Sequence, residues 1–259
     1  MEKIAANGIT IAFELRGSGP PLLLMHGNEA DHTMFDALTE HLAANFTVIA
    51  YDQRDCGQTE NRAEPYTLAD LGGDAATLIA ALGLPRAHVY GSSLGGLVAQ
   101  SLAARHPERV DRLVLGNTWR AGLSPAEFNP EEIKQLAAYR ADLAANAARI
   151  AELFFPPPFI QARPSIVEMF HDSGRSEGKR ARRGAVIGQT APADLSSFPR
   201  PVLLITGSED RVIPPAATAA LADTIPDARL VTLDGIGHVG SIQAPERVAR
   251  VITGFLQKV

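Results

Sequence analysis

The strand-to-helix stretch around Ser93 constrains the fold of this chain more than any other feature. A run of β-forming residues, Ala87–Tyr90, leads into Gly91, and a helical pattern follows over Leu94–Arg105. Ser93 lies between the two in a Gly-x-Ser-x-Gly frame, whose glycines let neighbouring backbone pass close to the serine. A tight turn of this kind projects the hydroxyl out of the fold, beside the free N–H groups of a helix start. The alternative is an ordinary glycine-rich loop with a surface serine.

Strand and helix patterns alternate along most of the chain. Pro21–Met25 is a continuous apolar run, typical of a strand that is buried on both faces, and Asn7-Gly8 is a type I′ hairpin signal. The alternation predicts an α/β fold with a mainly parallel eight-stranded sheet and helices on both faces. The predicted strands are Ile4–Ala6, Ile9–Arg16, Pro21–Met25, Phe46–Tyr51, Ala87–Tyr90, Arg112–Leu115, Val202–Thr206 and Arg229–Leu233.

The alternation stops between Arg120 and Phe198. Helical patterns dominate there, with the longest predicted helical stretch over Pro130–Phe154. We therefore predict a core domain made of residues 1–119 and 199–259, and a helical cap over residues 120–198, inserted after the sixth strand. Reactive residues of a parallel sheet collect at the C-terminal edge of its strands, and the insert is expected to cover that edge.

Composition excludes several classes of protein. The net charge of −5 argues against a nucleic-acid partner, because phosphate binding needs a basic surface. The single cysteine, Cys56, rules out an internal disulfide framework. No apolar run approaches the length of a membrane span or of a signal peptide, so a cytoplasmic protein without membrane association is predicted. Oligomeric state is left open.

A serine hydroxyl needs a base within hydrogen-bond reach to act as a nucleophile. His238 is favoured because it lies in a glycine-rich loop directly after the last predicted strand, at the edge where Ser93 is expected. His32 and His171 are the other histidines that could approach, but neither belongs to a supporting motif. His26 ends a buried strand and is interpreted as structural, and the remaining three are His41, His88 and His106.

The histidine in turn needs a carboxylate to fix its tautomer. Asp210 follows the strand Val202–Thr206, with Glu209 as the adjacent competitor. The loop after the preceding strand, Gly116–Thr118, offers no acid. The negative charge of a tetrahedral intermediate also needs donors, for which we predict the backbone N–H groups of Leu94 and Asn28.

With these motifs the chain resembles the α/β-hydrolase superfamily over nearly its whole length. The likeness comprises His26-Gly27, Asp52-x-Arg54, the frame Gly91–Gly95, Asp210, and Gly-x-Gly-His at 235–238, in the family order Ser…Asp…His. Two further segments, at 66–71 and 105–110, look like the small bacterial branch that contains β-ketoadipate enol-lactone hydrolases and carboxylesterases. The chain departs from that branch at Asp55, where glycine is usual, and at Gln243, where an acidic residue is common.

The resemblance and the residues together predict a serine hydrolase that cleaves a small carboxylic ester or lactone. Neither a cofactor nor a metal is expected. Two alternatives remain: a C–C bond hydrolase of a vinylogous diketone with the same triad, and a triad-bearing ligand receptor. Cys56 is the alternative nucleophile, although no histidine motif is tied to it.

Trp119 and Glu29 are predicted to contact the substrate, because each lies near the expected site. The basic stretch Arg175–Arg183 in the insert would attract a carboxylate-bearing substrate, or else forms a solvated helix face. Acidic Glu29 and Asp31 would oppose an anion. The charge of the substrate is therefore left open.

Overall fold

The computed structural model describes residues 1–188 and 191–257, and one sheet organises them. In this part of the chain the sheet has eight strands, as predicted, and their order is β1-β2-β4-β3-β5-β6-β7-β8. The strands are β1 Glu2–Ala6, β2 Ile9–Arg16, β3 Pro21–Met25, β4 Thr47–Tyr51, β5 Ala87–Ser92, β6 Val110–Gly116, β7 Val202–Gly207 and β8 Arg229–Leu233.

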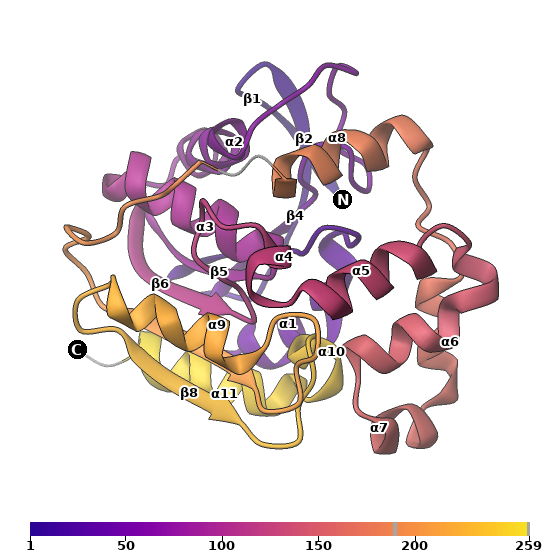
Figure 1. Ribbon diagram of the computed structural model, residues 1–259. Coiled ribbons are helices and arrows are strands. Elements are labelled where there is room, and N and C mark those ends of the chain that lie inside the picture. The colour runs from indigo at the N-terminus through magenta and orange to yellow at the C-terminus, as the bar shows by residue number, and fades with distance from the viewer. Residues whose placement is uncertain (189–190, 258–259) are drawn as a thin grey trace.

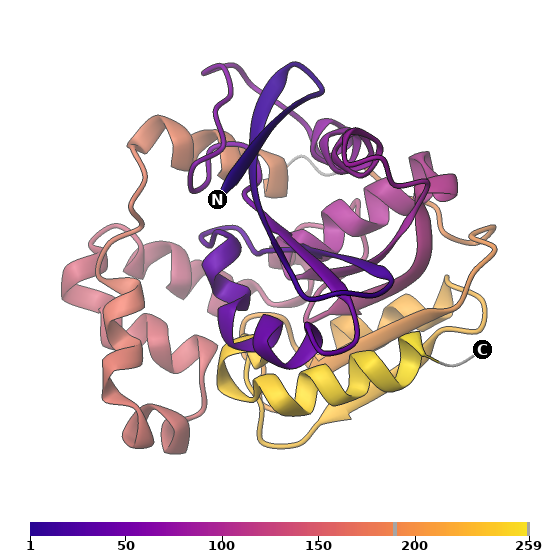
Figure 2. The ribbon, with the colours of Figure 1, turned by 180° about the vertical axis from the view of Figure 1, so that it is seen from behind.

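The strand pairing is mainly parallel. β2 pairs antiparallel with both β1 and β4, and every later neighbour pair is parallel. Asn7 and Gly8 join β1 to β2 with φ angles of 49° and 74°, the two positive values that a type I′ turn requires. The C-terminal ends of the parallel strands consequently meet at one edge of the sheet (Figures 1 and 2).

Helices cover both faces of the sheet (Figures 1 and 2). Leu23 of β3 belongs to the apolar cluster under α2 (Leu68–Ala81) and α3 (Leu94–Arg105). Leu22 and Leu24 belong to the cluster under α1 (Asp36–Leu42) and α11 (Pro245–Leu256). Successive side chains of a strand point to opposite faces, which explains the uninterrupted apolar run. The helices of the core are η1 His32–Phe35, α1 Asp36–Leu42, α2 Leu68–Ala81, α3 Leu94–Arg105, η2 Pro107–Arg109, α9 Pro215–Ala219, η4 Ala220–Asp223, α10 Gly240–Gln243 and α11 Pro245–Leu256, where η marks a 3₁₀ helix.

Helices alone occupy the described residues between β6 and β7, and most of them lie at one side of the molecule (Figures 1 and 2). The predicted single helical stretch over Pro130–Phe154 is wrong. The chain breaks there at residues 140–142, because the Asp142 side chain caps a new helix by accepting from the N–H of Ala145 at 3.1 Å. The helices are α4 Pro125–Phe128, α5 Pro130–Tyr139, α6 Leu143–Phe154, α7 Pro157–Ala162, η3 Pro164–Phe170 and α8 Glu177–Gly188.

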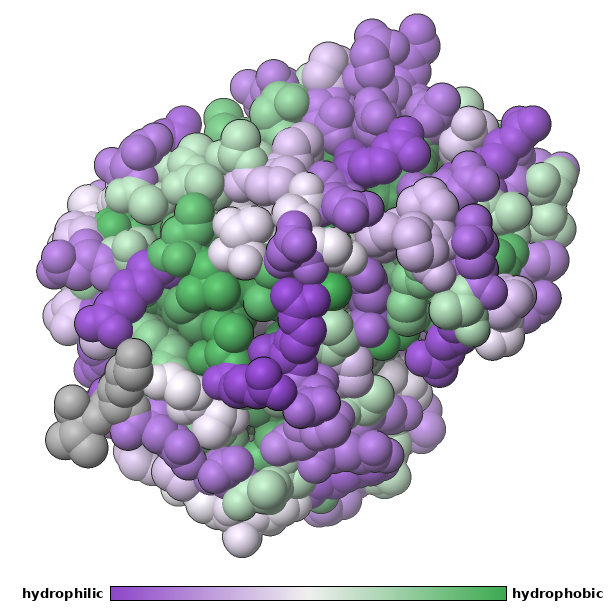
Figure 3. Space-filling view, turned by 90° about the horizontal axis from the view of Figure 1, so that it is seen from below, coloured by the Kyte–Doolittle hydropathy of each residue, from purple (hydrophilic) through white to green (hydrophobic). Residues whose placement is uncertain are grey.

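The predicted insert 120–198 and core segment 199–259 include residues 189–190 and 258–259, which lie outside the described residues. On the face seen from below, the largest apolar area lies beside a band of hydrophilic groups, and smaller apolar areas are scattered elsewhere (Figure 3). No helix in the described ranges combines the length and apolar composition that crossing a bilayer requires.

Candidate active site

Ser93 occupies a strained turn between β5 and α3. Its φ and ψ angles are 56° and −123°, a conformation that non-glycine residues rarely adopt. Close backbone packing allows no side chain on either flank: a Cβ on Gly91 would lie 2.2 Å from the Gly95 carbonyl oxygen, and one on Gly95 would lie 1.9 Å from that of Met25. The glycines of the frame are therefore required by the turn itself.

The next strand holds this turn in place. The Ser93 N–H donates to the Gly116 carbonyl at the end of β6 over 3.0 Å. The Ser93 carbonyl accepts from the Thr118 hydroxyl at 2.8 Å and from the N–H of Gly96 at 2.9 Å. These bonds balance the strain of the turn, and they leave the serine side chain at the edge of the sheet.

His238 reaches Ser93 from the loop after β8. Its Nε2 lies 3.1 Å from Ser93 Oγ, and its side chain is 5% exposed. The helical insert fixes the same residue from the other side, since the His238 N–H donates to the Phe154 carbonyl at 2.8 Å. The Phe154 ring meets the imidazole edge-on at 5.2 Å between centroids. Core and insert thus both position the imidazole.

Asp210, which follows β7, completes the arrangement. Its Oδ2 lies 2.9 Å from His238 Nδ1, and its Oδ1 accepts the N–H groups of Val212 and Ile213 at 3.0 and 2.8 Å. A carboxylate oxygen accepts, so Nδ1 carries the imidazole proton and Nε2 is free to accept from Ser93. The competitor Glu209 is exposed. The structure therefore brings Ser93, His238 and Asp210 into one hydrogen-bonded chain.

Asn117, to which the sequence motifs assign no role, lies against the carboxylate. Its Nδ2 donates to Asp210 Oδ2 at 2.8 Å, and its backbone is left-handed, with φ at 47°. Asparagine tolerates that conformation better than most residues. The sequence does carry a signal here, because a polar amide stands at the strand end where an alternative acid was sought.

The two residues predicted as oxyanion donors both lie beside Ser93. Leu94 begins α3, so its N–H has no intrahelical acceptor. Asn28 lines the cavity in front of Ser93, and Gly27 before it lies next to the serine, since a Cβ on Gly27 would be in van der Waals contact with Ser93 Cβ at 3.5 Å. Their service as donors to a reaction intermediate remains a prediction.

A cavity of about 790 Å³ opens onto Ser93 and His238. The core loops and the helical insert both line it, and it contains the predicted contact residues Trp119 and Glu29. Trp119 is buried, with its indole N–H donating to the Leu123 carbonyl at 2.9 Å. Glu29 forms an ion pair with Arg140 of the insert at 2.5 Å. Whether either residue binds a substrate remains a prediction.

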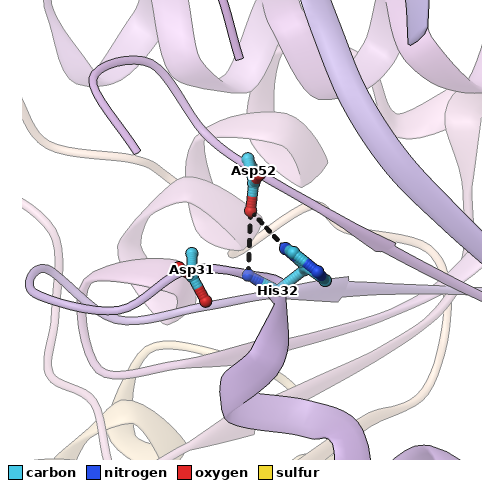
Figure 4. A group of neighbouring side chains, drawn as sticks. All are labelled: Asp31, His32 and Asp52. Atoms are coloured by element: carbon cyan, nitrogen blue, oxygen red, sulfur yellow. Dashed lines mark hydrogen bonds and ion pairs between the residues drawn. The ribbon is translucent and has the colours of Figure 1, made fainter. Parts of the chain in front are cut away.

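Three side chains with metal-ligating atoms gather near the loop after β3: Asp31, His32 and Asp52 (Figure 4). Asp52 Oδ1 accepts from the N–H of His32 at 2.9 Å and lies 2.8 Å from its Nδ1, while Asp52 Oδ2 accepts from the N–H of Gln58. Asp31 is occupied in capping η1. Through these hydrogen bonds the group links two loops of the core, which explains why the three side chains lie together. Neither His32 nor the exposed His171 lines the cavity.

Cys56 is buried, and its thiol donates to the Arg54 carbonyl at 3.4 Å. Burial raises the pKa of this thiol. A buried thiol of raised pKa is a poor nucleophile, since the thiolate is the reactive form. The structure gives Cys56 no role beside Ser93.

Comparison with known proteins decides the family. The sequence model of the protein family described as having the alpha/beta hydrolase fold matches residues 20–245. The chain belongs to the α/β-hydrolase family. A 2-hydroxymuconate semialdehyde hydrolase of Pseudomonas putida is 31% identical, over 98% of this chain and 93% of that protein.

Solved α/β-hydrolase structures agree with this assignment. A hydrolase from Pseudomonas aeruginosa PA01 superposes with a TM-score of 0.84 and 33% identity, over 99% of this chain and 98% of that one. The enol-lactonase from Burkholderia xenovorans LB400 gives a TM-score of 0.84 and 28% identity, over 99% and 100%. Family and relatives together identify the chain as a hydrolase.

Proposed function

We propose that the chain is a serine hydrolase that cleaves a small carboxylic ester or lactone through an acyl-enzyme on Ser93. The observation that carries this proposal is the hydrogen-bonded chain Asp210–His238–Ser93, whose serine and histidine line the cavity. The 28% identity to an enol-lactonase supports the lactone part.

The geometry supports an acyl-transfer mechanism. Ser93 Oγ attacks the carbonyl carbon while His238 Nε2 takes the hydroxyl proton, and Asp210 stabilises the imidazolium that forms. The N–H groups of Leu94 and Asn28 donate to the oxyanion of the tetrahedral intermediate. Its collapse breaks the bond to the alcohol oxygen, which receives the proton from His238. A water molecule then attacks the acyl-enzyme by the same steps, and the carboxylic acid product leaves Ser93.

In this proposal residues 120–198 act as a cap that excludes solvent from the reacting carbonyl. The support is that the cavity is lined from both sides, by Leu136 and Ile150 of the insert and by Met34 and Ile213 of the core. An apolar wall of this kind strengthens the hydrogen bonds that stabilise the oxyanion, because it lowers the local dielectric constant.

The test is a panel of p-nitrophenyl esters, enol-lactones, homoserine lactones and thioesters, assayed with wild-type protein and Ser93→Ala. We expect Ser93→Ala to keep the wild-type unfolding temperature and to lower kcat by at least about 10⁴-fold. Cys56→Ala is the matched control and should retain turnover. Retained turnover in Ser93→Ala, or its loss in Cys56→Ala, would contradict the proposal.

Hydrolysis of a C–C bond in a vinylogous diketone is the second candidate. The 31% identity to a 2-hydroxymuconate semialdehyde hydrolase favours it, and it would use the same three residues. Adding such a diketone to the panel separates the two: an ester hydrolase should turn over esters at least about 100-fold faster than the diketone, in kcat/KM.

A further inference from the structure

Arg183 of α8 is the bulkiest side chain that the fold buries completely, with 1% of its surface exposed. Within the described residues its guanidinium forms no ion pair, and its hydrogen bonds go to neutral oxygens instead. Burying a cation without a counter-ion costs free energy, so such a group is retained where its charge has a use. Nothing in the local sequence sets Arg183 apart from the other basic residues of its helix.

The bonds of Arg183 converge on the loop that faces Ser93. Nη2 donates to the Gly27 carbonyl at 3.2 Å, and Nε donates to the Asn28 carbonyl at 2.9 Å. Nη1 donates to the Arg54 carbonyl at 3.2 Å, and the Gln53 side-chain oxygen lies at the weak limit of hydrogen bonding, 3.4 to 3.5 Å. One side chain from the insert therefore holds two core loops.

The carbonyl of Gly27 and the N–H of Asn28 belong to the same peptide group. In a trans peptide these two bonds point in opposite directions, and the structure contains no cis peptide in its described part. A cation on the Gly27 oxygen therefore directs the Asn28 N–H away from α8. It also withdraws electron density from that N–H, since hydrogen bonds at the two ends of an amide polarise one another.

His26 supplies a second donor to the same oxygen. The N–H of Gln53 donates to His26 Nε2 at 3.1 Å, so the proton of the neutral ring is on Nδ1, which lies 2.8 Å from the Gly27 oxygen. Burial keeps the pKa of His26 well below its ordinary value, and the charge of Arg183 lowers it further. The neutral imidazole and the guanidinium thus act on one carbonyl from within the protein.

We propose that Arg183 is a positioning residue for the oxyanion hole: its charge, on the Gly27 carbonyl, orients and polarises the peptide whose N–H is provided by Asn28. The inference rests on the proposed function. It makes the helical insert part of the catalytic apparatus, because stabilisation of the intermediate then depends on α8 being docked.

The experiment compares Arg183→Gln, Arg183→Lys and the control Arg182→Gln on one ester that the wild type hydrolyses. Arg182 is the neighbouring residue on α8, but it pairs with Asp55 and does not touch residues 27–28. Inhibition by a trifluoromethyl ketone, which forms a tetrahedral adduct with a serine, is measured beside kcat, KM, inhibition by the product acid and the unfolding temperature.

We expect Arg183→Gln to lower kcat about ten-fold or more with KM almost unchanged. The affinity for the ketone should fall by the same factor, while the affinity for the product acid stays constant. Arg183→Lys, which keeps the charge but lacks the fork, should fall between Arg183→Gln and wild type. Arg182→Gln should stay within about two-fold of wild type in kcat.

Three results would overturn the proposal: equal kcat losses in the Arg183→Gln and Arg182→Gln variants, a loss confined to KM, or unchanged ketone affinity. If Arg183→Gln does not fold, Arg183→Lys decides, and wild-type kcat and ketone affinity in that variant would refute the role. Absence of wild-type turnover on every ester and lactone would instead contradict the proposed function, so the two failures are distinguishable.

Discussion

At the scale of single residues, the acid of the site lies where two strand ends meet. Asp210 follows β7 and Asn117 follows β6, yet their side chains are hydrogen-bonded neighbours, with Asn117 Nδ2 donating to Asp210 Oδ2 at 2.8 Å. Both loops could therefore deliver a carboxylate to His238 Nδ1. The sequence places the acid on the second loop, and the structure shows that the first lies within reach.

This proximity predicts that the acid can be moved. Asp210→Asn should lower kcat by about 10⁴-fold, because an amide stabilises the wrong imidazole tautomer. The double variant Asp210→Asn with Asn117→Asp should recover at least about ten-fold of that loss, since the new carboxylate replaces a group that bonds the same Asp210 oxygen as His238 Nδ1. Steady-state kinetics on one ester measures both. Asn117→Asp alone is the control. No recovery in the double variant would contradict the inference that the loop after β6 can supply the acid.

His26 gives a pH-dependence of stability. The pKa of His26 in the folded protein lies well below the ordinary 6.5, because burial and then Arg183 disfavour its charged form. Below pH 6.5 the unfolded chain therefore binds a proton that the folded chain does not, and the free energy of unfolding falls as pH falls.

We expect wild type to lose about 1 kcal/mol more than His26→Gln between pH 7 and pH 5.5, as one additional proton bound on unfolding requires. Urea unfolding at both pH values gives the comparison. Parallel losses in the two proteins would show that His26 titrates normally.

At the scale of elements, periodicity and turn residues predict the framework. β3 and β5 are recognisable as buried strands, and Thr67 and Asp70 form a capping box before α2. Such local patterns do not predict contacts between residues that are far apart in the sequence. Arg183 and Gly27 are separated by 156 positions, and burial of Arg183 follows from how α8 docks, which no local pattern records. Periodicity does not predict the break before α6, because residues that favour helix continue across it and only the Asp142 cap marks the start of the new helix.

The same docking explains the departure from the family pattern at Asp55. Its backbone has φ at 61°, where glycine would be unstrained, but its carboxylate accepts two bonds from Arg182 at 2.8 and 2.7 Å. An aspartate retained in a left-handed conformation is thus compensated by an ion pair between core and insert.

A double-mutant cycle of Asp55→Asn and Arg182→Gln should give a coupling free energy of about 1 kcal/mol, modest because Arg182 is partly exposed. Urea unfolding measures it, and the coupling should weaken in 0.5 M salt. A coupling near zero at low salt would mean that the pair contributes nothing to docking of α8.

At the scale of the whole molecule, three arginines of the basic stretch bind loops of the core, whereas Arg180 is exposed. Arg175 donates to the Ala30 and Asp55 carbonyls, and Arg182 and Arg183 also bind core loops. Of these three arginines only Arg175 lines the cavity, so the charge that a substrate meets is set mainly by residues outside the basic stretch. Among the described residues, four acidic and three basic side chains line the cavity. They are Glu29, Asp31, Asp36 and Asp172, and Arg140, Arg163 and Arg175.

The pair Glu29–Arg140 spans core and insert at the cavity, with both side chains 32% exposed, and so it is the place to change that charge. Glu29→Gln removes the negative partner and leaves a cation facing the substrate. The ratio of kcat/KM for p-nitrophenyl hemisuccinate to that for p-nitrophenyl butyrate should rise about five-fold, since one partly exposed charge at contact distance contributes about 1 kcal/mol. Arg140→Gln should lower the same ratio. Raising the ionic strength from 0.01 to 0.5 M should reduce both effects. If the ratio moves in neither variant, the acyl group of the substrate lies away from this pair, and selectivity for charge must arise at Arg163 or Arg175.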